Sequence, residues 1–335
     1  MTTVSSVAAL LAVLKGAGAG AVISLTPGNW SGVVIRGVEA PGVTITGQAA
    51  VLHDLELRRS SGITFKDLEF STAGYPVGSF GPKATYPFRL KDNRNIEFIG
   101  VNAHGDPNST LANDVSGFFV DSSPNTTFSR DTFSYLHAAV VQLNSDHFTF
   151  TGNACHNNRD DCVDNVGSSW VKIIGNHCYS NHPDGKIDTD HPDCIQFWTN
   201  QDTHPPHDID IEYNRYERGT GTATQFIFMR ANYPAPYNLP FTNVTIKGNI
   251  SEGSQLNGIV IMVAKSVDIE NNRITAYCEP RIMAKTWIEA AAVEGLTLRN
   301  NKAAFYNSVG SKGINEGHNI VTACVGVPKT STAEP

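Results

Sequence analysis

Two short acidic stretches share an Asp-Cys-aliphatic core: "NNRDDCVDN", which starts at Asn157, and "HPDCIQFW", which starts at His191. Their carboxyl groups belong to Asp160, Asp161, Asp164 and Asp193. Neighbouring carboxyl groups raise one another's pKa, so that one stays protonated while another is ionised. Hydrolysis of a glycosidic bond requires such a pair. A calcium site and a set of solvated turns are the alternative interpretations of the same residues.

A short repeat predicts the elements that position these aspartates. Apolar residues alternate in it, and an Asn ends each unit. Its clearest copies are "FTFTGN", "VKIIGN", "IDIEYN", "VTIKGN", "VDIENN" and "LTLRNN", ending at Asn153, Asn176, Asn214, Asn249, Asn272 and Asn301. Earlier variants are "ITFKDL", "IEFIGV" and "TTFSRD". Alternation with a period of two predicts a strand, and the Asn stands where the strand ends and the chain turns.

A short strand and a polar turn that recur with variable insertions predict a solenoid. The sequence has neither the leucine-rich pattern nor the four-strand unit of a propeller, so we expect an all-β, single-domain, right-handed parallel β-helix. Residues 1–20 would form a capping helix that starts at Ser5 or Ser6 and ends at Gly16. A cleaved signal peptide is the alternative there, although no positive charge precedes the apolar run. Residues 21–312 would form the β-helix and residues 313–335 a C-terminal tail or cap.

The recurrent Asn fixes the register of neighbouring coils. It places Asp161 over Asp193, Cys162 over Cys194 and Asp164 over Gln196. We expect the aliphatic residues between them to point inward and Asp164 and Gln196 to point outward. Asp161 and Asp193 would lie at a corner, where alternation breaks and both reach the surface. The stacked Asn side chains would bond to backbone groups of the next turn.

Long insertions flank the predicted acidic patch, at 71–86, 103–116, 180–192, 199–208 and 232–241. Insertions of this length on a regular solenoid usually carry function. With the neighbouring strands they supply aromatic rings that can stack on sugars and cations that can pair with acidic sugars. The candidate catalytic residues are Asp161, Asp164 and Asp193. The candidate substrate-binding residues are Arg159, Asp160, Lys186, His191, Gln196, Trp198, Arg230 and Tyr233.

Composition excludes several classes of protein. The chain has 335 residues, 40% hydrophobic and 17% charged, with a net charge of −7. The charge argues against nucleic-acid binding, and no apolar run is long enough to span a membrane. The cysteines, Cys155, Cys162, Cys178, Cys194, Cys278 and Cys324, match no zinc or CxxC spacing. We interpret them as buried thiols in core or ladder positions, with oxidation left open.

The repeat and the acidic stretches together resemble the pectin-lyase-like superfamily, over roughly residues 5–310. Asp160-Asp161-Cys162 resembles the "DDC" element of polygalacturonase-type hydrolases, which implies roles as general acid and base. The family's further aspartate one coil earlier is replaced here by His137-Ala138-Ala139, and its Gly-His-Gly and Arg-Ile-Lys segments are missing. The spacing of Asp160, Asp161 and Asp164 is similar to the calcium-binding DDxxD element of one pectate-lyase family. Phage tailspike depolymerases, which spread carboxylates over neighbouring coils, are a third resemblance.

Gln196 decides between these resemblances. A β-elimination needs a base beside the uronate, and Gln196, which cannot titrate, stands where the lyase family has its catalytic lysine. The sequence therefore predicts an endo-acting glycoside hydrolase on an extracellular or capsular polysaccharide. A polysaccharide lyase and a non-catalytic glycan-binding viral adhesin are the alternatives.

The hydrolase interpretation requires no cofactor; calcium, if bound, would use Asp160, Asp161 and Asp164. The expected partner is the polysaccharide, with no nucleic acid and no membrane. The tailspike resemblance implies a homotrimer and action outside the cell as part of a phage virion. Secretion by a non-obvious route is the alternative.

Overall fold

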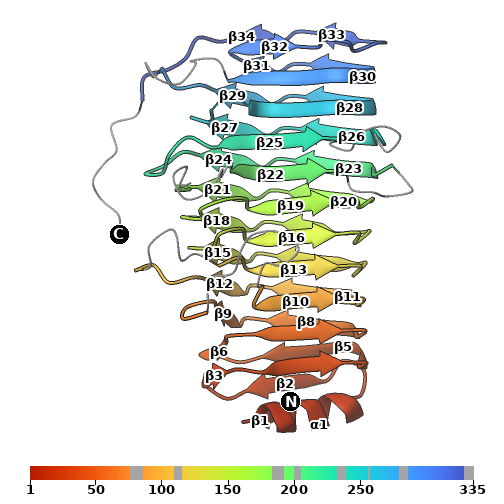
Figure 1. The fold of residues 1–335 in the computed structure, drawn as a ribbon, viewed down its shortest axis with the longest axis vertical. Coiled ribbons are helices and arrows are strands. Elements are labelled where there is room, and N and C mark those ends of the chain that lie inside the picture. The colour runs from red at the N-terminus through yellow and green to blue at the C-terminus, as the bar shows by residue number, and fades with distance from the viewer. Residues whose placement is uncertain are drawn as a thin grey trace.

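The computed structural model describes residues 1–75, 86–108, 115–182, 192–199, 205–231, 239–255, 257–278 and 286–327. These residues form a right-handed parallel β-helix, whose coils stack along one long axis (Figure 1). The predicted all-β fold is confirmed. No helix among the described residues is long and apolar enough to cross a bilayer.

The strands form two parallel sheets. The larger sheet contains β1 Thr2–Val4, β2 Val22–Leu25, β4 Val33–Arg36, β5 Glu39–Thr46, β7 Leu55–Arg58, β8 Ser61–Lys66, β10 Phe88–Lys91, β11 Arg94–Ile99, β13 Phe118–Asp121, β14 Thr126–Ser129, β16 Val140–Leu143, β17 Thr149–Thr151, β19 Val163–Val166, β20 Val171–Ile174, β22 Asp193–Trp198, β23 His207–Glu212, β25 Gln225–Arg230, β26 Phe241–Lys247, β28 Asn257–Glu270, β30 Trp287–Arg299, β32 Phe305–Asn307 and β33 Asn315–Gly317. The smaller sheet contains β3 Gly28–Trp30, β6 Ala50–Leu52, β9 Glu69–Ser71, β12 Asn102–His104, β15 Thr132–Ser134, β18 Ala154–His156, β21 His177–Tyr179, β24 Arg215–Glu217, β27 Ile250–Glu252, β29 Arg273–Thr275, β31 Lys302–Ala303 and β34 Ile320–Val321.

Each coil contributes strands to both sheets, and equivalent strands of successive coils pair in parallel. Strands β16, β17 and β18 form one coil, and β19, β20 and β21 form the next, with Val140 beside Val163 and Phe150 beside Ile173. The inward positions carry the core. In register there, Phe65, Phe98 and Phe128 stack with ring centroids 5.1 Å and 4.7 Å apart.

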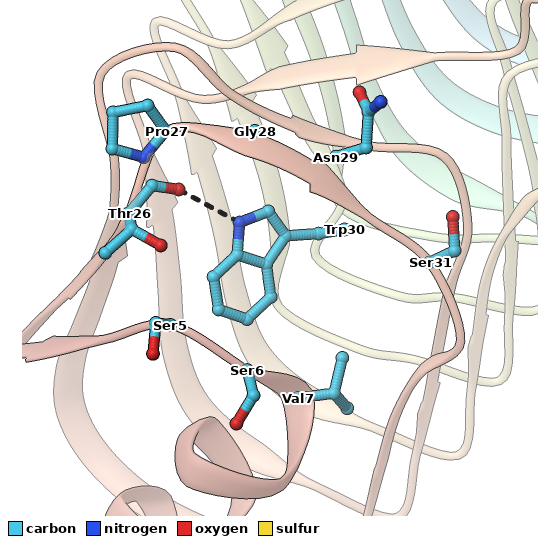
Figure 2. A pocket seen from close by; sticks show the side chains of 9 residues that line it. All are labelled: Ser5, Ser6, Val7, Thr26, Pro27, Gly28, Asn29, Trp30 and Ser31. Atoms are coloured by element: carbon cyan, nitrogen blue, oxygen red, sulfur yellow. Dashed lines mark hydrogen bonds between the residues drawn. The ribbon is translucent and has the colours of Figure 1, made fainter.

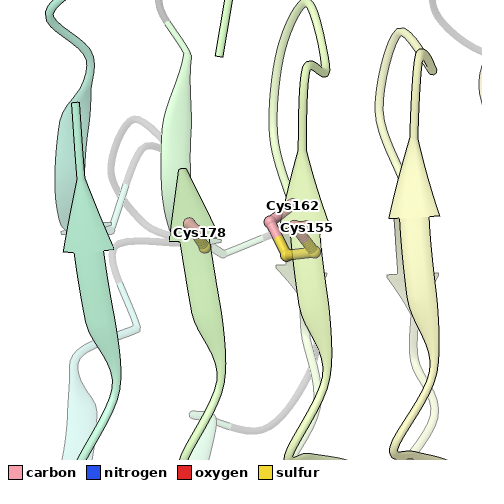
Figure 3. A group of neighbouring side chains, drawn as sticks. All are labelled: Cys155, Cys162 and Cys178. Carbon is pink, nitrogen blue, oxygen red and sulfur yellow. A yellow bond between two sulfur atoms is a disulfide. The ribbon is translucent and has the colours of Figure 1, made fainter. Parts of the chain in front are cut away.

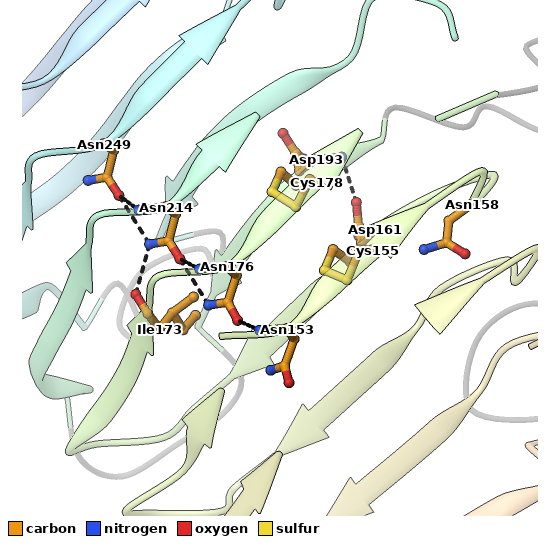
Figure 4. Close-up of a disulfide and its surroundings, with 12 residues drawn as sticks. Asn153, Cys155, Asn158, Asp161, Ile173, Asn176, Cys178, Asp193, Asn214 and Asn249 are labelled. Atoms are coloured by element: carbon orange, nitrogen blue, oxygen red, sulfur yellow. Dashed lines mark hydrogen bonds between the residues drawn. A yellow bond between two sulfur atoms is a disulfide. The ribbon is translucent and has the colours of Figure 1, made fainter. Parts of the chain in front are cut away.

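The recurrent Asn forms a buried hydrogen-bonded ladder between coils, as the repeat predicts. Asn214 is typical: its Oδ1 accepts the backbone N–H of Asn176 at 3.0 Å, and its Nδ2 donates to the Ile173 carbonyl at 2.8 Å. The same side chain also bonds Asn249 on the following coil. Figure 4 shows this row of amides running from coil to coil. Because each amide satisfies backbone groups at a turn, the ladder holds the register of the coils.

Helix α1, Val7–Gly16, lies at the N-terminal end of the solenoid (Figure 1). Ser6 caps it by accepting the backbone N–H of Ala9, and Leu10 and Leu14 pack into the core. A cavity of about 250 Å³ lies beside the start of this helix, where the Trp30 indole N–H donates to the Thr26 carbonyl (Figure 2). At the other end, β33 and β34 lie within the segment expected as a tail or cap and pair with β30 and β31.

Candidate functional site

The acidic stretches meet on neighbouring coils in the middle of the solenoid. Asp164 lies in β19, directly beside Gln196 of β22, and Val163 lies beside Ile195. Asp160 and Asp161 lie in the bend before β19, and Asp193 opens β22. The predicted register of Asp164 over Gln196 is therefore confirmed.

Asp161 and Asp193 do not reach the surface, and this part of the prediction was wrong. Asp161 is 3% exposed and Asp193 is 0% exposed. The corner turns the Asp161 carboxylate toward the next coil, where its Oδ1 accepts the backbone N–H of Asp193 at 2.7 Å (Figure 4). Gln196 donates from Nε2 to Asp193 Oδ2 at 2.8 Å. These two hydrogen bonds from the protein replace the bonds to water that the two carboxyl groups would have made at the surface.

Burial and mutual repulsion raise the pKa values of these carboxyl groups. Loss of solvent raises the pKa of Asp164 to about 8, the nearby Asp160 charge adds to the rise, and the bond from Trp198 opposes it. Burial, followed by the charges of Asp160, Asp164 and Asp193, raises the pKa of Asp161 well above its usual range. Burial likewise raises the pKa of Asp193, against the bond from Gln196. At neutral pH the cluster therefore holds protons that isolated aspartates would have lost.

Trp198 and Arg230 continue the site along the sheet surface. The Trp198 indole bonds the Asp164 carboxyl, and 39% of the residue is exposed. Arg230 is the parallel partner of Trp198 on the next coil and is exposed. An accessible ring thus contacts Asp164, and a cation lies beside that ring on the following coil. Among the other candidates, Arg159 and Asp160 are buried, whereas Lys186, His191 and Tyr233 lie outside the described residues.

The structure adds two residues to the site, Tyr86 and Ser116. Tyr86 is buried with Ala138 and Val141 and bonds Ser116; burial, and then the Asp164 charge, raise its pKa. Ser116 Oγ lies 3.3 Å from His137 Nδ1, and His137 Nε2 lies 3.7 Å from Asp160 Oδ2. Tyr86 and Ser116 are the last residues of two of the predicted insertions. The length of these two segments between predicted strands identified them as insertions. It gave no information on which of their residues approach the aspartates.

Solved structures with the same architecture include a double mutant of the tailspike protein of E. coli bacteriophage HK620. It has a TM-score of 0.62 and 14% identity, over 96% of this chain and 63% of that one. A family 28 exopolygalacturonase of Yersinia enterocolitica has a TM-score of 0.53 and 9% identity, over 98% and 76%. ORF18 of Geobacillus virus E2 has a TM-score of 0.50 and 8% identity, over 92% and 56%.

The chain has the fold of these proteins, a parallel β-helix. At these identities the likeness shows the fold alone. The β-helix spans less than two thirds of both viral proteins, 63% of one and 56% of the other. No protein-family profile matches the sequence, and no curated protein matches it.

The cysteines of the β-helix form disulfides, so their interpretation as thiols was wrong. Bridges join Cys155 to Cys162, Cys178 to Cys194 and Cys278 to Cys324. Cys155 lies beside Cys178 of the next coil. Each of the first two bridges, however, closes across a corner between consecutive strands, from β18 to the residue before β19 and from β21 to β22, where the Cα atoms are 5.8 Å and 6.1 Å apart.

The described residues contain one group of three potential metal ligands within 4.8 Å of one another: the sulfurs of Cys155, Cys162 and Cys178 (Figure 3). Asp160, Asp161 and Asp164 do not form such a group in this part of the chain. Calcium binding by these aspartates stays a prediction. The arrangement of the carboxyl groups themselves suits proton transfer, because protonated and ionised forms can coexist within it.

Proposed function

We propose that this β-helix is a glycoside hydrolase that cleaves an extracellular or capsular polysaccharide internally. One observation carries the proposal: Asp164, with its pKa raised to about 8, lies beside a half-exposed Trp198 and a set of further buried carboxyl groups. A carboxyl group that stays protonated at neutral pH can donate its proton to the leaving oxygen of a glycosidic bond. Asp164 is the general acid in this proposal.

Asp193 supplies the second carboxyl group. Its Oδ2 accepts a hydrogen bond from Gln196, and this bond stabilises the ionised form of Asp193 against the burial that raises its pKa. Asp161 is a positioning residue, because it bonds the backbone of Asp193. Trp198 stacks against a sugar ring, and Arg230 pairs with an acidic substituent of the polymer.

Mass spectrometry of the products from a panel of acidic and neutral bacterial polysaccharides tests this function. We expect saturated oligosaccharides, each cut adding one water. Asp164→Asn and Asp193→Asn should each lower kcat by about 100-fold or more, in line with the usual contribution of a general acid or base. The exposed Asp268 of β28 offers the matched control, Asp268→Asn, which should keep full activity. Unsaturated products would contradict hydrolysis and support β-elimination. Glycan binding without shortening of the polymer would contradict both reactions and support a non-catalytic adhesin.

The proposed reaction uses no metal, so activity should survive dialysis against a chelator. A loss of activity that calcium restores would instead support the calcium site at Asp160, Asp161 and Asp164.

We further propose that the chain acts outside the cell as a homotrimer on a virion, supported by its likeness in fold to two viral proteins. Light scattering on the purified chain would measure the mass of the assembly, and a monomer would contradict the trimer.

A further inference from the structure

A serine, a histidine and an aspartate meet at the corresponding corners of three successive coils, beside the acidic cluster. Ser116 precedes β13, His137 precedes β16 and Asp160 precedes β19. Ser116 Oγ lies 3.3 Å from His137 Nδ1, and His137 Nε2 lies 3.7 Å from Asp160 Oδ2. In this order a hydroxyl can pass its proton to an imidazole that a carboxylate orients.

The backbone holds these corners together. The N–H of His137 donates to the Val115 carbonyl at 3.2 Å, and the N–H of Asp160 donates to the His137 carbonyl at 2.7 Å. The strands that follow, β13, β16 and β19, pair in parallel register. Because each corner is bonded to the next, the three side chains are carried by a rigid part of the fold, as a catalytic site requires.

A fourth group, the Tyr86 hydroxyl, bonds Ser116. Burial is the main cause that raises the pKa of Tyr86, so this hydroxyl keeps its proton at neutral pH. A protonated tyrosine beside a nucleophilic oxygen can donate to the oxyanion that forms when a carbonyl group is attacked. The four side chains thus include a nucleophile, a base, a group that orients the base and a donor for the oxyanion.

Apolar side chains line the same place on the outer face of the larger sheet. Tyr86 packs with Ala138 and Val141 in a small cluster that is separate from the main core. Its ring stacks on that of Phe119, a half-buried residue of β13, with centroids 4.8 Å apart. An apolar wall beside a nucleophile suits the hydrocarbon part of an acyl group.

We propose that Ser116, His137 and Asp160 form an esterase centre that removes small O-acyl groups from the polysaccharide. Ser116 Oγ attacks the ester carbonyl carbon, and its proton passes to His137 Nδ1. The ester C–O bond then breaks, and the sugar oxygen takes that proton. Water attacks the acyl-serine and gives a proton to His137, the carboxylic acid leaves, and the proton returns to Ser116. Asp160 is a positioning residue, and Tyr86 donates to the oxyanion.

The neighbouring acidic cluster is the reason for choosing an ester on a polysaccharide. Ser116 stands two coils from Asp161 in the register of the larger sheet, at about 4.8 Å per coil. An acylated sugar at Ser116 would therefore lie close to the glycosidic bond that the cluster cleaves. This choice of polymer rests on the proposed function, whereas the hydrolysis of an ester does not.

A serine-reactive fluorophosphonate tests the nucleophile on the full chain. After incubation, digestion and mass spectrometry, we expect one adduct, on Ser116. Ser116→Ala should remove it, whereas Ser31→Ala, at an exposed serine between β3 and β4, should keep it. An unlabelled Ser116 in a chain that circular dichroism shows to be folded would overturn the proposal.

Hydrolysis of p-nitrophenyl acetate measures the activity without a polymer. Ser116→Ala and His137→Gln should each lower kcat/KM by about 100-fold or more. Asp160→Asn should lower kcat and leave KM nearly unchanged, because Asp160 orients His137 and does not contact the ester. An unchanged kcat/KM in Ser116→Ala would contradict the assignment of the nucleophile.

Acetylated bacterial polysaccharides separate this activity from the proposed glycosidase. Free acetate and polymer length are measured in the same reaction. Release of acetate without shortening would support the esterase and contradict the glycoside hydrolase. Shortening of an acetylated polymer without release of acetate would contradict the esterase alone.

Discussion

Asp164 and Asp131 are both buried carboxyl groups whose pKa is raised to about 8, and loss of solvent is the main cause for each. Their surroundings then differ. Asp164 lies near the charge of Asp160 and accepts a hydrogen bond from the half-exposed Trp198. Asp131 lies in the interior ladder at a position that Asn occupies on later coils, and its Oδ1 accepts the backbone N–H of Val101 at 2.8 Å. In the proposed mechanism the titration of Asp164 limits catalysis, whereas the titration of Asp131 affects the stability of the fold.

The raised pKa of Asp164 predicts the alkaline limit of activity. A general acid works only while it is protonated, so kcat/KM should be high at neutral pH and fall as the pH rises through about 8. Measurement of kcat/KM on the polysaccharide across this range checks the prediction. A rate that stays level well above pH 8 would remove Asp164 from the role of acid.

Asp131 predicts a stability difference that depends on pH. Among the described residues its buried Oδ2 has no hydrogen-bond partner, whereas the Asn that replaces it on the next coil, Asn153, donates from Nδ2 to the Phe128 carbonyl. The folded chain holds the Asp131 proton up to pH about 8, but the unfolded chain releases it near the usual aspartate pKa of about 4. Folding stability from this group is complete below pH 4 and is lost progressively as the pH rises toward 8.

Asp131→Asn should remove that loss. We expect the variant to gain stability over the wild type as the pH rises from about 4 to about 8. Thermal unfolding of both chains at several pH values measures the gap. Asp268→Asn, at an exposed strand position, should show no such trend. A difference in thermal stability between the variant and the wild type that stays constant with pH would contradict the raised pKa of Asp131.

At the scale of the element, the Asn ladder joins each turn to the next. Asn214→Ala would leave the buried N–H of Asn176 and the Ile173 carbonyl without their partners. Each unsatisfied buried group costs about 1–3 kcal/mol, so for two groups we expect a loss of about 2–6 kcal/mol in the free energy of unfolding. Denaturant unfolding measures it. Asn102→Ala, at an exposed strand position, should change stability by less than about 0.5 kcal/mol. Equal effects would mean that the ladder does not determine stability.

The alternation and the recurrent Asn were enough to predict the strands, the parallel stacking and the pairing of Asp164 with Gln196. They could not predict the corner between β18 and β19. The alternation of apolar residues predicts the direction of a side chain only within a strand. Asp161 and Cys162 lie outside the strands, so it does not predict theirs. The burial of Asp161 and the Cys155–Cys162 bridge both depend on how that bend turns. Tyr86 was missed because it reaches the cluster from an earlier coil.

At the scale of the whole molecule, stability is distributed over coils that contact mainly their neighbours. Removal of the Cys278–Cys324 bridge, whose cysteines are 46 residues apart, should therefore have a local effect. We expect faster amide hydrogen exchange in β29, β31 and β34 of the double variant Cys278→Ser/Cys324→Ser. Exchange in β10 and β13 should match that of the wild type. Uniformly faster exchange along the chain would show instead that the coils unfold as one unit.

The direction of stacking also determines how the molecule bears force. The hydrogen bonds between coils run along the long axis, so tension between the two ends would open them one coil after another. Tension applied beyond Cys324 would enter the fold through the bridge at Cys278 and bypass the residues between them. The first coil to unfold would then be the one that ends at Cys278. The residues between Cys278 and Cys324 would not be extended, because the bridge closes them into a loop.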